Sequence, residues 1–488
     1  MKDKANKWVY IISLLFVAIN AFFISKEMYL FCIAPVVLLI IILAFFYYDK
    51  LLLLIVFLTP LSIPLHELYE NLDFDMNLPT EPLLMGLTII FIFKLLLDKS
   101  FDKKILYHPV SIAIYLYILC LFVTSVTSTM PIVSFKLLIS RLCFIIPLFF
   151  LSTQLFKNKK NFYRYLWLYI IPLLFVIIYA VTRHAQYGLL DKKIAHWAAN
   201  PFYKDHTSYG AILAMFIPVI VGFTTNKSNT SRKKLLSWIL LIIFTIALLL
   251  SYSRAAWVGV IGAFGVWIII KLKIKFRRVA LFAGIILLLG FAFESQILIQ
   301  LQRNKQDSSV NVENHIKSIT NVSSDASNLE RINRWNCAIR MFKKKPFFGW
   351  GPGTYMFKYA PFQLSYEKTI ISTNEGNKGN AHSEYLGPLA ESGIFGLISI
   401  LLIIITTIYT AVNVYSKSQN KKVKMLSLIA LLGLTTYYIH GFLNNFLDMD
   451  KATVPFWGFT AIIVALDVYY KNTKESDDGD EKLFKVNS

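Results

Sequence analysis

Residues 235–250, LLSWILLIIFTIALLL, run without a charged side chain and without amphipathic spacing, as expected of a membrane-spanning helix. Comparable apolar blocks, such as Phe31 to Tyr48, recur as far as Tyr470. A helix needs about 20 apolar residues to cross roughly 30 Å of hydrocarbon. Because 56% of the 488 residues are hydrophobic and only 16% are charged, we predict an all-α polytopic membrane protein.

The apolar blocks predict about 12 to 14 transmembrane helices. The predicted spans are residues 8–25, 28–47, 51–65, 82–97, 108–127, 131–155, 162–182, 208–225, 234–251, 254–271, 279–297, 394–415, 425–444 and 453–470. The lower count applies because the first three blocks are closely spaced, and residues 51–65, broken by Pro60 and Pro64, have the pattern of a re-entrant or interfacial segment. Either count places both termini in the cytoplasm.

The formal charge of +21 comes from lysines and arginines in short connectors between the blocks, such as Lys271 to Arg278. This is the pattern of the positive-inside rule, so the lipid bilayer rather than a nucleic acid is the predicted partner of these charges. Alternate connectors, such as His66 to Glu81, lack the basic excess and are predicted to face outward. The four cysteines have neither a disulfide nor a zinc-site pattern, and no metal or cofactor is predicted.

The blocks divide the chain into four parts. Residues 1–297 hold about 11 spans, and residues 298–393 form a large outward loop or lid, which is too long for a plain connection. Residues 394–470 hold three more spans, and residues 471–488 form a disordered cytoplasmic tail. Within the loop, residues 329–343 have apolar side chains at helical spacing, which predicts an amphipathic helix.

Arg141 is a cation deep within a predicted span, about 15 Å of helix rise from Pro131. A cation at that depth costs about 2.5 to 3.5 kcal/mol and normally faces a cavity or a counter-charge. It indicates either an anion site or a buried ion pair, for which Glu294 and Asp467 are the acids near span ends. Lys136 lies a little more than one helical turn closer to the outer end.

Arg254, in SYSRAAWVG, lies at the outer start of its predicted span. An arginine in that place is either a snorkelling anchor or an anion ligand. A guanidinium group can hold a phosphate through two hydrogen bonds. Arg254 and Arg141, approaching from two spans, are therefore candidates for clamping a diphosphate.

His382 begins HSEYLGPLAESGIFG, where the outward loop meets a predicted span. An imidazole that is neutral near pH 7 can accept a proton from a hydroxyl. Glu384 or Glu391 could orient this imidazole or contact a sugar, while an ordinary loop histidine is the competing interpretation. The histidines between Arg183 and His206 lack metal-ligand spacing.

Together these residues resemble the O-antigen ligase and polymerase superfamily of bacterial envelope glycan assembly. His382 and Gly393 match its histidine, ten intervening residues and glycine, and the loop matches an R…W…P…GxGxxxY-like run. The residues of that run are Arg334 or Arg331, Trp335, Pro346, Gly349, Gly351, Gly353 and Tyr355. The resemblance covers roughly Asp205 to Phe446.

Arg141 and Arg254 correspond to outward-facing arginines in mid-chain spans of the family. Family ligases often have leucine four positions after the arginine, whereas Val258 follows Arg254 and Ile145 follows Arg141. This departure leaves the assignment of each arginine open.

The resemblance implies an inverting, metal-independent glycosyltransferase of the bacterial inner membrane. It would move a glycan from a polyprenyl diphosphate carrier to an acceptor hydroxyl at the periplasmic face, with His382 as the base and Arg254 and Arg141 on the diphosphate. Candidates for substrate binding or orientation are Glu384, Glu391, Arg334, Tyr355 and Lys136. The acceptor is lipid A core for a ligase, a second lipid-linked repeat unit for a polymerase, and a protein for an O-oligosaccharyltransferase.

A lipid-linked oligosaccharide flippase is the alternative from another functional class. Such a transporter is expected to show two related halves and no large outer lid. The long loop at residues 298–393 argues against it.

Overall fold

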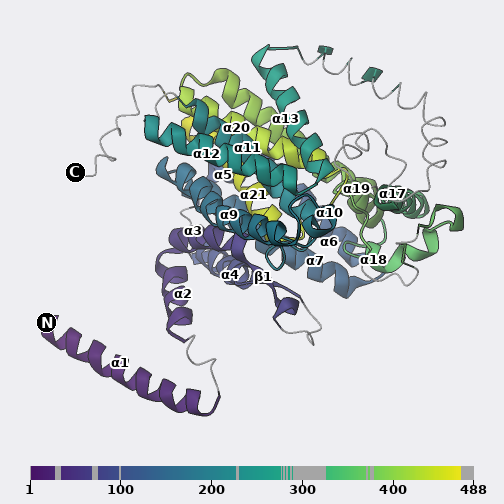
Figure 1. Cartoon of the computed structure of the whole chain (residues 1–488). Helices are drawn as coiled ribbons and strands as arrows, with labels where there is room; N and C mark the ends of the chain where they lie inside the picture. Colours follow the sequence, from purple (N-terminus) through teal and green to yellow (C-terminus); the bar gives the residue numbers. More distant parts are fainter. Residues whose placement is uncertain are drawn as a thin grey trace.

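The computed structural model describes residues 2–27, 34–68, 75–97, 101–226, 230–275, 326–369, 372–373 and 379–473, and the single positions 277, 278, 281, 284, 285 and 288. Most of the predicted tail and of the predicted span at residues 279–297 lies outside these residues. The described chain is a helical bundle with a group of shorter helices at one end, while α1 stands apart from the bundle (Figure 1). We call residues 326–385, as far as they are described, the lid.

The helices that precede the lid are α1 (Lys2–Ser25), α2 (Ala34–Phe46), α3 (Tyr48–Leu58), α4 (Thr80–Leu97), α5 (Lys103–Leu106), α6 (Pro109–Val126), α7 (Pro131–Ile145), α8 (Ser152–Leu155), α9 (Lys160–Tyr187), α10 (Lys192–Ala195), α11 (His206–Thr225), α12 (Ser231–Leu250) and α13 (Arg254–Lys271). The lid and the helices after it are α17 (Ala326–Lys344), α18 (Tyr355–Lys358), α19 (Leu386–Lys417), α20 (Lys421–His440) and α21 (Asp450–Ala465). Short 3-10 or π segments are η2 (Thr59–Leu61), η3 (Leu65–Glu67), η4 (Ile146–Leu151), η5 (Ala360–Phe362), η6 (Ser365–Glu367) and η7 (Leu466–Tyr470). Two short strands, β1 (Ile63–Pro64) and β2 (Asn77–Leu78), pair antiparallel.

Within the described residues, nine helices are long and apolar enough to span a membrane. They are α6, α7 with its continuation through α8, α9, α11, α12, α13, α19, α20, and α21 with η7. This confirms the prediction of an all-α polytopic membrane protein. Residues 13–25 of α1 and 37–46 of α2 are shorter apolar helical stretches. The total of 12 to 14 spans stays a prediction.

The proline pair in the predicted span at residues 51–65 ends a helix. α3 stops at Leu58, a single 3-10 turn contains Pro60, and the chain then extends through Ser62 into β1. Proline lacks an N–H and restricts the residue before it, so a regular helix does not continue through this pair. Residues 51–65 therefore do not form one continuous helix.

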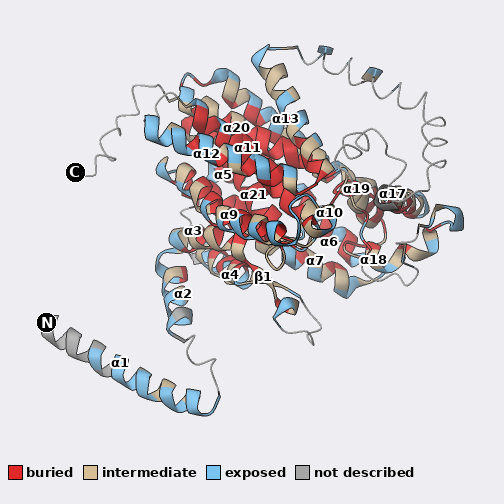
Figure 2. Cartoon of the chain, viewed as in Figure 1, coloured by how far each residue is buried: buried red, intermediate tan, exposed pale blue. Residues whose placement is uncertain are grey.

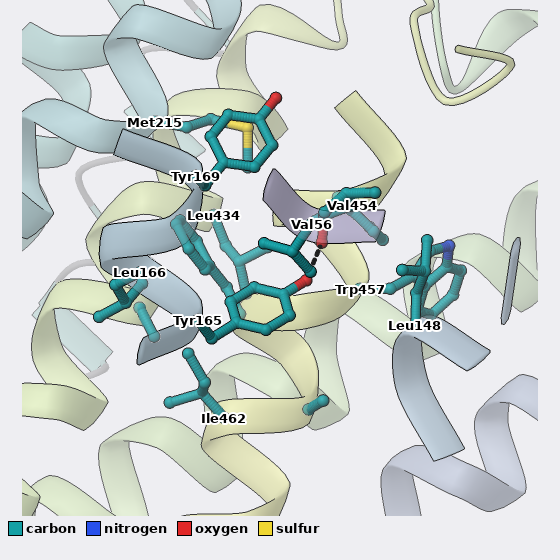
Figure 3. Close-up of a cluster of buried hydrophobic side chains, with 14 of the residues drawn as sticks. Val56, Leu148, Tyr165, Leu166, Tyr169, Met215, Leu434, Val454, Trp457 and Ile462 are labelled. Carbon is teal, nitrogen blue, oxygen red and sulfur yellow. Dashed lines mark hydrogen bonds between the residues drawn. The ribbon is translucent and has the colours of Figure 1, made fainter. Parts of the chain in front are cut away.

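α21 is the centre of the bundle, and all of its residues are buried. By contrast, only 22% of the 18 residues of α13 are buried (Figure 2). Figure 3 shows how α21 is held: the Tyr165 hydroxyl of α9 donates to the Val454 carbonyl at 2.8 Å, and Trp457 and Ile462 lie in the same cluster. Lipid tails are as apolar as these side chains, so close packing and hydrogen bonds hold such helices together.

Two charged residues are buried where α21 begins. Asp450 and Lys451 are 0% and 1% exposed. Asp450 accepts hydrogen bonds from Ser62 at 2.6 Å and from Thr80, and the Lys451 ammonium donates to Ser62 at 2.8 Å. Lys451 Nζ also lies 3.5 Å from Asp450 Oδ1. A buried ion pair requires such complete partners, so this pair joins the start of α21 to the N-terminal segment.

The lid docks on α19 through the glycine-rich segment 346–355. Gly349 has a φ of +64°, and a Cβ there would lie 2.3 Å from the Glu391 carbonyl oxygen. Gly393, with a φ of +66°, kinks α19, and its Cβ would lie 2.2 Å from the Phe347 carbonyl oxygen. Only glycine allows backbones to approach this closely in that conformation. Gly349 of the loop motif is therefore explained by docking of the lid on α19, while a Cβ on Gly351 would instead clash with Ser128 before α7.

Candidate functional site

His382 lies at the end of the lid, just before α19. Its φ is +46°, a left-handed conformation that is uncommon outside glycine. The His382 N–H donates to Asn380 Oδ1 at 3.1 Å, and Trp335 of α17 donates to the His382 carbonyl at 3.5 Å. These contacts hold the peptide that directs the imidazole, and such backbone outliers cluster at functional sites.

The surroundings of His382 keep its imidazole neutral. Burial, together with the charges of Arg331 and Arg334, lowers the pKa of His382 to about 4, against the opposing influence of Glu330 and Asp205. At pH 7 the ring is therefore unprotonated, and one of its nitrogens can accept a proton.

Several chain segments meet around the same two charges. Arg331 of α17 and Asp205, which precedes α11, interact electrostatically with His382, with His206 at the start of α11 and with His440 at the end of α20. Among the described residues, the Arg331 guanidinium and the Asp205 carboxylate are thus shared by three imidazoles in the region where the lid meets these helix ends. Such a set can bind an anion and transfer a proton.

The Glu384 carboxylate holds a turn of the main chain. Its Oε1 accepts hydrogen bonds from the Tyr437 hydroxyl at 2.6 Å and from the N–H groups of Phe446 and Leu447 at 2.8 and 2.9 Å. The Glu384 N–H donates to the Gly441 carbonyl at 2.7 Å. Glu384 therefore fixes the connector between α20 and α21 to the segment that carries His382.

The same connector binds Arg141. Arg141 Nη1 donates to the Leu447 carbonyl, and Nη2 pairs with Asp448 Oδ1 at 2.5 Å. The Arg141 side chain is 13% exposed and that of Asp448 is 51% exposed. Burial raises the pKa of Glu384, and the charge of Arg141 opposes that rise. Arg141 and His382 are thus linked through Glu384.

The ion partner of Arg141 differs from the acids that the sequence suggested. Asp467 pairs instead with Lys471 at 2.8 Å and with His108 at 3.4 Å, and Glu294 lies outside the described residues. The actual partner, Asp448, belongs to a connector and not to an apolar block. It was missed for that reason, because only acids near apolar span ends were considered.

Arg254 begins α13 and is partly buried. The backbone of the next residue, Ala255, lies beside the His440 ring. Further along α13, a Cβ on Gly259 would lie 2.7 Å from the Thr436 carbonyl oxygen of α20. The start of α13 is therefore held against the end of α20 that carries His440.

Three other candidate residues hold the lid together. Arg334 Nε pairs with Glu330 at 2.6 Å, and both side chains are less than one-tenth exposed. The Tyr355 hydroxyl donates to the Arg334 carbonyl at 2.7 Å, and the Tyr355 N–H donates to Glu391 Oε1 at 3.0 Å. Of the two arginines that could match the family motif, Arg334 is paired within the lid core and also acts on His382, while Arg331 acts on His382, His206 and His440.

Lys136 is exposed on α7, toward the end that begins at Pro131. The His196 and His206 rings stack with their centroids 4.1 Å apart. In the part of the chain that the structure describes, no group of three or more His, Cys, Asp and Glu side chains is placed to hold a metal ion. The expected absence of a metal and of a cofactor remains a prediction.

The described contacts separate the candidates into two neighbouring groups. In the first group, Arg141 and Glu384 both contact the connector between α20 and α21. In the second group, Arg254 lies near the end of α20 that carries His440. The sequence placed His206 and Asp205 in an outward loop without a predicted role, and His440 was not among the candidates. The position of these residues could have indicated a role, because each lies at the end of a predicted span on the same side of the membrane as His382.

Residues 239–401 match the protein-family model described as O-antigen ligase. This segment contains Arg254, the described part of the lid and His382, whereas Arg141 precedes it. No curated protein matched the chain.

Proposed function

We propose that this chain, a membrane enzyme of the O-antigen ligase superfamily, transfers a glycan from a polyprenyl diphosphate carrier to an acceptor hydroxyl. The observation that carries the proposal is the neutral, largely buried imidazole of His382 near the charges of Arg331 and Asp205. It lies where the lid meets a span, and a lipid-linked sugar must react at such a boundary because its carrier stays in the bilayer.

The chemistry needs one base and a stabilised leaving group. The acceptor oxygen attacks the anomeric carbon while the bond from that carbon to the diphosphate oxygen breaks. The hydroxyl proton passes to His382, and the bonding electron pair leaves with the diphosphate. Attack from the face opposite the leaving group inverts the anomeric centre. A positioned base of this kind contributes roughly 10² to 10⁴ in rate.

The arginines supply the charge that a departing diphosphate needs. Arg254 and Arg141 are the proposed ligands, and Arg331 joins them because its charge reaches His382. Guanidinium groups fixed in a dry site stabilise a developing anion without reorganising. No metal is required by this scheme.

The other candidates take supporting roles. Glu384 positions the turn that holds Arg141. Glu391, Arg334 and Tyr355 keep the lid docked, and Lys136 is an exposed cation that could contact the donor head group. A positioning role for Glu384 is supported by its three hydrogen bonds to the 437–447 region.

The proposed location is the bacterial inner membrane, with the lid in the periplasm and both termini in the cytoplasm. The lysine and arginine clusters in alternate connectors support this orientation. Ligase-type transfer to lipid A core is the preferred reaction, followed by repeat-unit polymerisation and protein O-glycosylation. A flippase is disfavoured, because the large lid has no role in a transporter with two related halves.

The proposal is tested with His382→Ala and Arg254→Ala in a glycan transfer assay. Both variants should lose transfer while inserting into the membrane normally, and His66→Ala, an exposed histidine of another connector, should retain it. Normal transfer by both site variants would reject the site.

The acceptor is tested by the glycan products of a strain that lacks the protein. Accumulation of lipid-linked polymer is expected for a ligase, whereas accumulation of single lipid-linked repeats would indicate a polymerase. Unchanged glycans in the envelope and on the carrier would contradict both reactions.

A further inference from the structure

We propose that the face formed by α6 and α7 binds the lipid end of the donor. In this site the first isoprene units lie in an apolar groove, and the adjoining phosphate binds Arg141 and displaces Asp448. The inference rests on the proposed function and locates the carrier of its donor.

The groove lies between α6 and α7 and has a volume of about 330 Å³. It is lined by Tyr115, Ile118, Leu119, Phe122, Leu138 and Leu142. The lining residues of α6 occupy positions i, i+3, i+4 and i+7, so they share one helix face. No charged side chain lines the groove. An isoprenoid chain is branched and apolar, and it suits a groove with this lining.

Arg141 does not itself line the groove, but it is adjacent in α7 to residues that do. It lies between Leu138 and Leu142 in the sequence of α7, and residues three apart on a helix have Cβ atoms about 5 to 6 Å apart. The charge of Arg141 also acts on Tyr117 of α6, so the guanidinium lies near the interface of the two helices. An apolar groove with a cation nearby suits a lipid that ends in a phosphate. A groove without a nearby cation would offer nothing to bind the phosphate.

One of the two N–H groups on the Nε–Nη2 side of the Arg141 guanidinium has no hydrogen-bond acceptor among the described residues. Nη1 is occupied by the Leu447 carbonyl, and Nη2 is paired with Asp448, whereas Nε is buried and has no hydrogen-bond partner among the described residues. The Nε and Nη2 groups of arginine can hold a phosphate through two parallel hydrogen bonds. Asp448 takes only one of these two donors.

The Asp448 side chain can separate from Arg141 without disturbing the backbone of the connector. Its side chain is half-exposed, and Glu384 holds the N–H groups of Phe446 and Leu447, which precede it. The Asp448 side chain can therefore turn away while the connector and the Leu447 carbonyl stay in place. Asp448 would then act as a specificity-determining residue, because a diphosphate competes for Arg141 more strongly than the single phosphate of an ordinary phospholipid.

The lipid half of the site is tested with Leu119→Trp, which fills the groove. The matched control is Leu116→Trp, because Leu116 is also an exposed leucine of α6 but does not line the groove. KM is measured with one glycan diphosphate carried on a long polyprenyl chain and on a short prenyl chain. Leu119→Trp should raise KM several-fold for the long chain only. Equal effects on both donors, or an effect only on co-purified phospholipid, would overturn the groove assignment.

The phosphate half is tested with inorganic pyrophosphate as an inhibitor of transfer. Asp448→Asn should lower its inhibition constant about two- to fivefold, the scale of one lost partly exposed ion pair. Asp75→Asn is the control, since Asp75 is 52% exposed and pairs with His66 at 2.7 Å. The double variant Arg141→Ala/Asp448→Asn should lose the gain. Weaker inhibition of Asp448→Asn would show that Asp448 supports anion binding, against the proposal.

These outcomes separate the inference from the proposed function. If His382→Ala and Arg254→Ala abolish transfer but Leu119→Trp and Asp448→Asn behave like their controls, only the lipid site is wrong. If His382→Ala and Arg254→Ala transfer normally, the proposed function itself fails.

Discussion

The Arg141 side and the His382 side of the candidate site are built in different ways. Around Arg141, hydrogen bonds dominate: Glu384 accepts three of them from Tyr437, Phe446 and Leu447, and Leu447 in turn accepts one from Arg141. Around His382, burial and the charge of Arg331 dominate. The Arg141 side is therefore a hydrogen-bonded frame. On the His382 side, burial and nearby charge set the pKa of the base.

The difference indicates how each side should respond to mutation. Removing a member of the hydrogen-bonded frame leaves buried donors without acceptors and should lower stability. Removing a charge near the imidazole should change its protonation while the fold persists. Variants that affect stability and variants that affect the pH profile should therefore fall on opposite sides of the site.

Glu384→Ala should have the largest effect on the frame. It leaves the Tyr437 hydroxyl and the Leu447 N–H without their acceptor, while the Phe446 N–H keeps the Tyr437 oxygen at 3.1 Å. We therefore expect a loss of about 2 to 4 kcal/mol in the free energy of unfolding. Thermal unfolding in detergent measures this loss. Glu384→Gln keeps an acceptor oxygen and should lose less. Equal stability of Glu384→Ala and the unmodified protein would remove the distinction between the two sides.

Gly393→Ala should come next, because it acts where the lid meets α19. The positive φ and the 2.2 Å approach of the Phe347 carbonyl oxygen to a Cβ predict a loss of about 1 to 3 kcal/mol. Gly387→Ala is the control on the same helix, since the nearest atom to its Cβ would be 3.8 Å away. Thermal unfolding and limited proteolysis of the lid report the effect. Similar behaviour of the two variants would contradict close docking at Gly393.

Arg331→Gln should change the pH profile rather than the fold. The neutral imidazole is the active form, and its pKa of about 4 places the acidic loss of activity near that pH. Without the Arg331 charge, protonation becomes easier, so the acidic limb should move upward, toward the ordinary histidine value of about 6.5. The pH dependence of kcat/KM measures this shift. Lys343→Gln, an exposed change on the same helix, should leave the limb in place, and an unmoved limb in Arg331→Gln would reject the electrostatic account.

The smallest expected effect concerns Cys337 in the lid core. The thiol is fully buried, and burial raises its pKa to about 11. Because the thiolate is the reactive form, a water-soluble maleimide at pH 8 should label Cys337 slowly in the folded protein and rapidly after unfolding. Peptide mass spectrometry follows the labelling. Rapid labelling without unfolding would show that the lid opens freely.

The fold class followed from the sequence because apolar blocks and basic connectors report directly on the membrane. The buried position of α21 did not follow, since its sequence is no more apolar than that of α13, and only packing distinguishes a central helix from a lipid-facing one. The end of α3 was foreshadowed by Pro60, because a proline acts on its own segment.

The candidate site was predictable only in part. His382 and Arg141 stand out locally, one at a boundary and the other as a cation in an apolar block. The partners of these residues do not, because Asp448 is more than 300 residues from Arg141 in the chain. Glu384 was named as a candidate, but its hydrogen bonds to backbone groups leave no trace in the residue types of the connector.

The ion pair at the start of α21 bears on how the protein is assembled during synthesis. A chain enters the bilayer from its N-terminus onward, so Ser62 and Thr80 arrive long before Asp450 and Lys451. Releasing an unpaired lysine and aspartate into lipid is costly, so α21 should leave the insertion machinery only by docking on helices already in place. Its late arrival completes the bundle, and a polypeptide interrupted before Asp450 would lack its centre and become a target for membrane proteases.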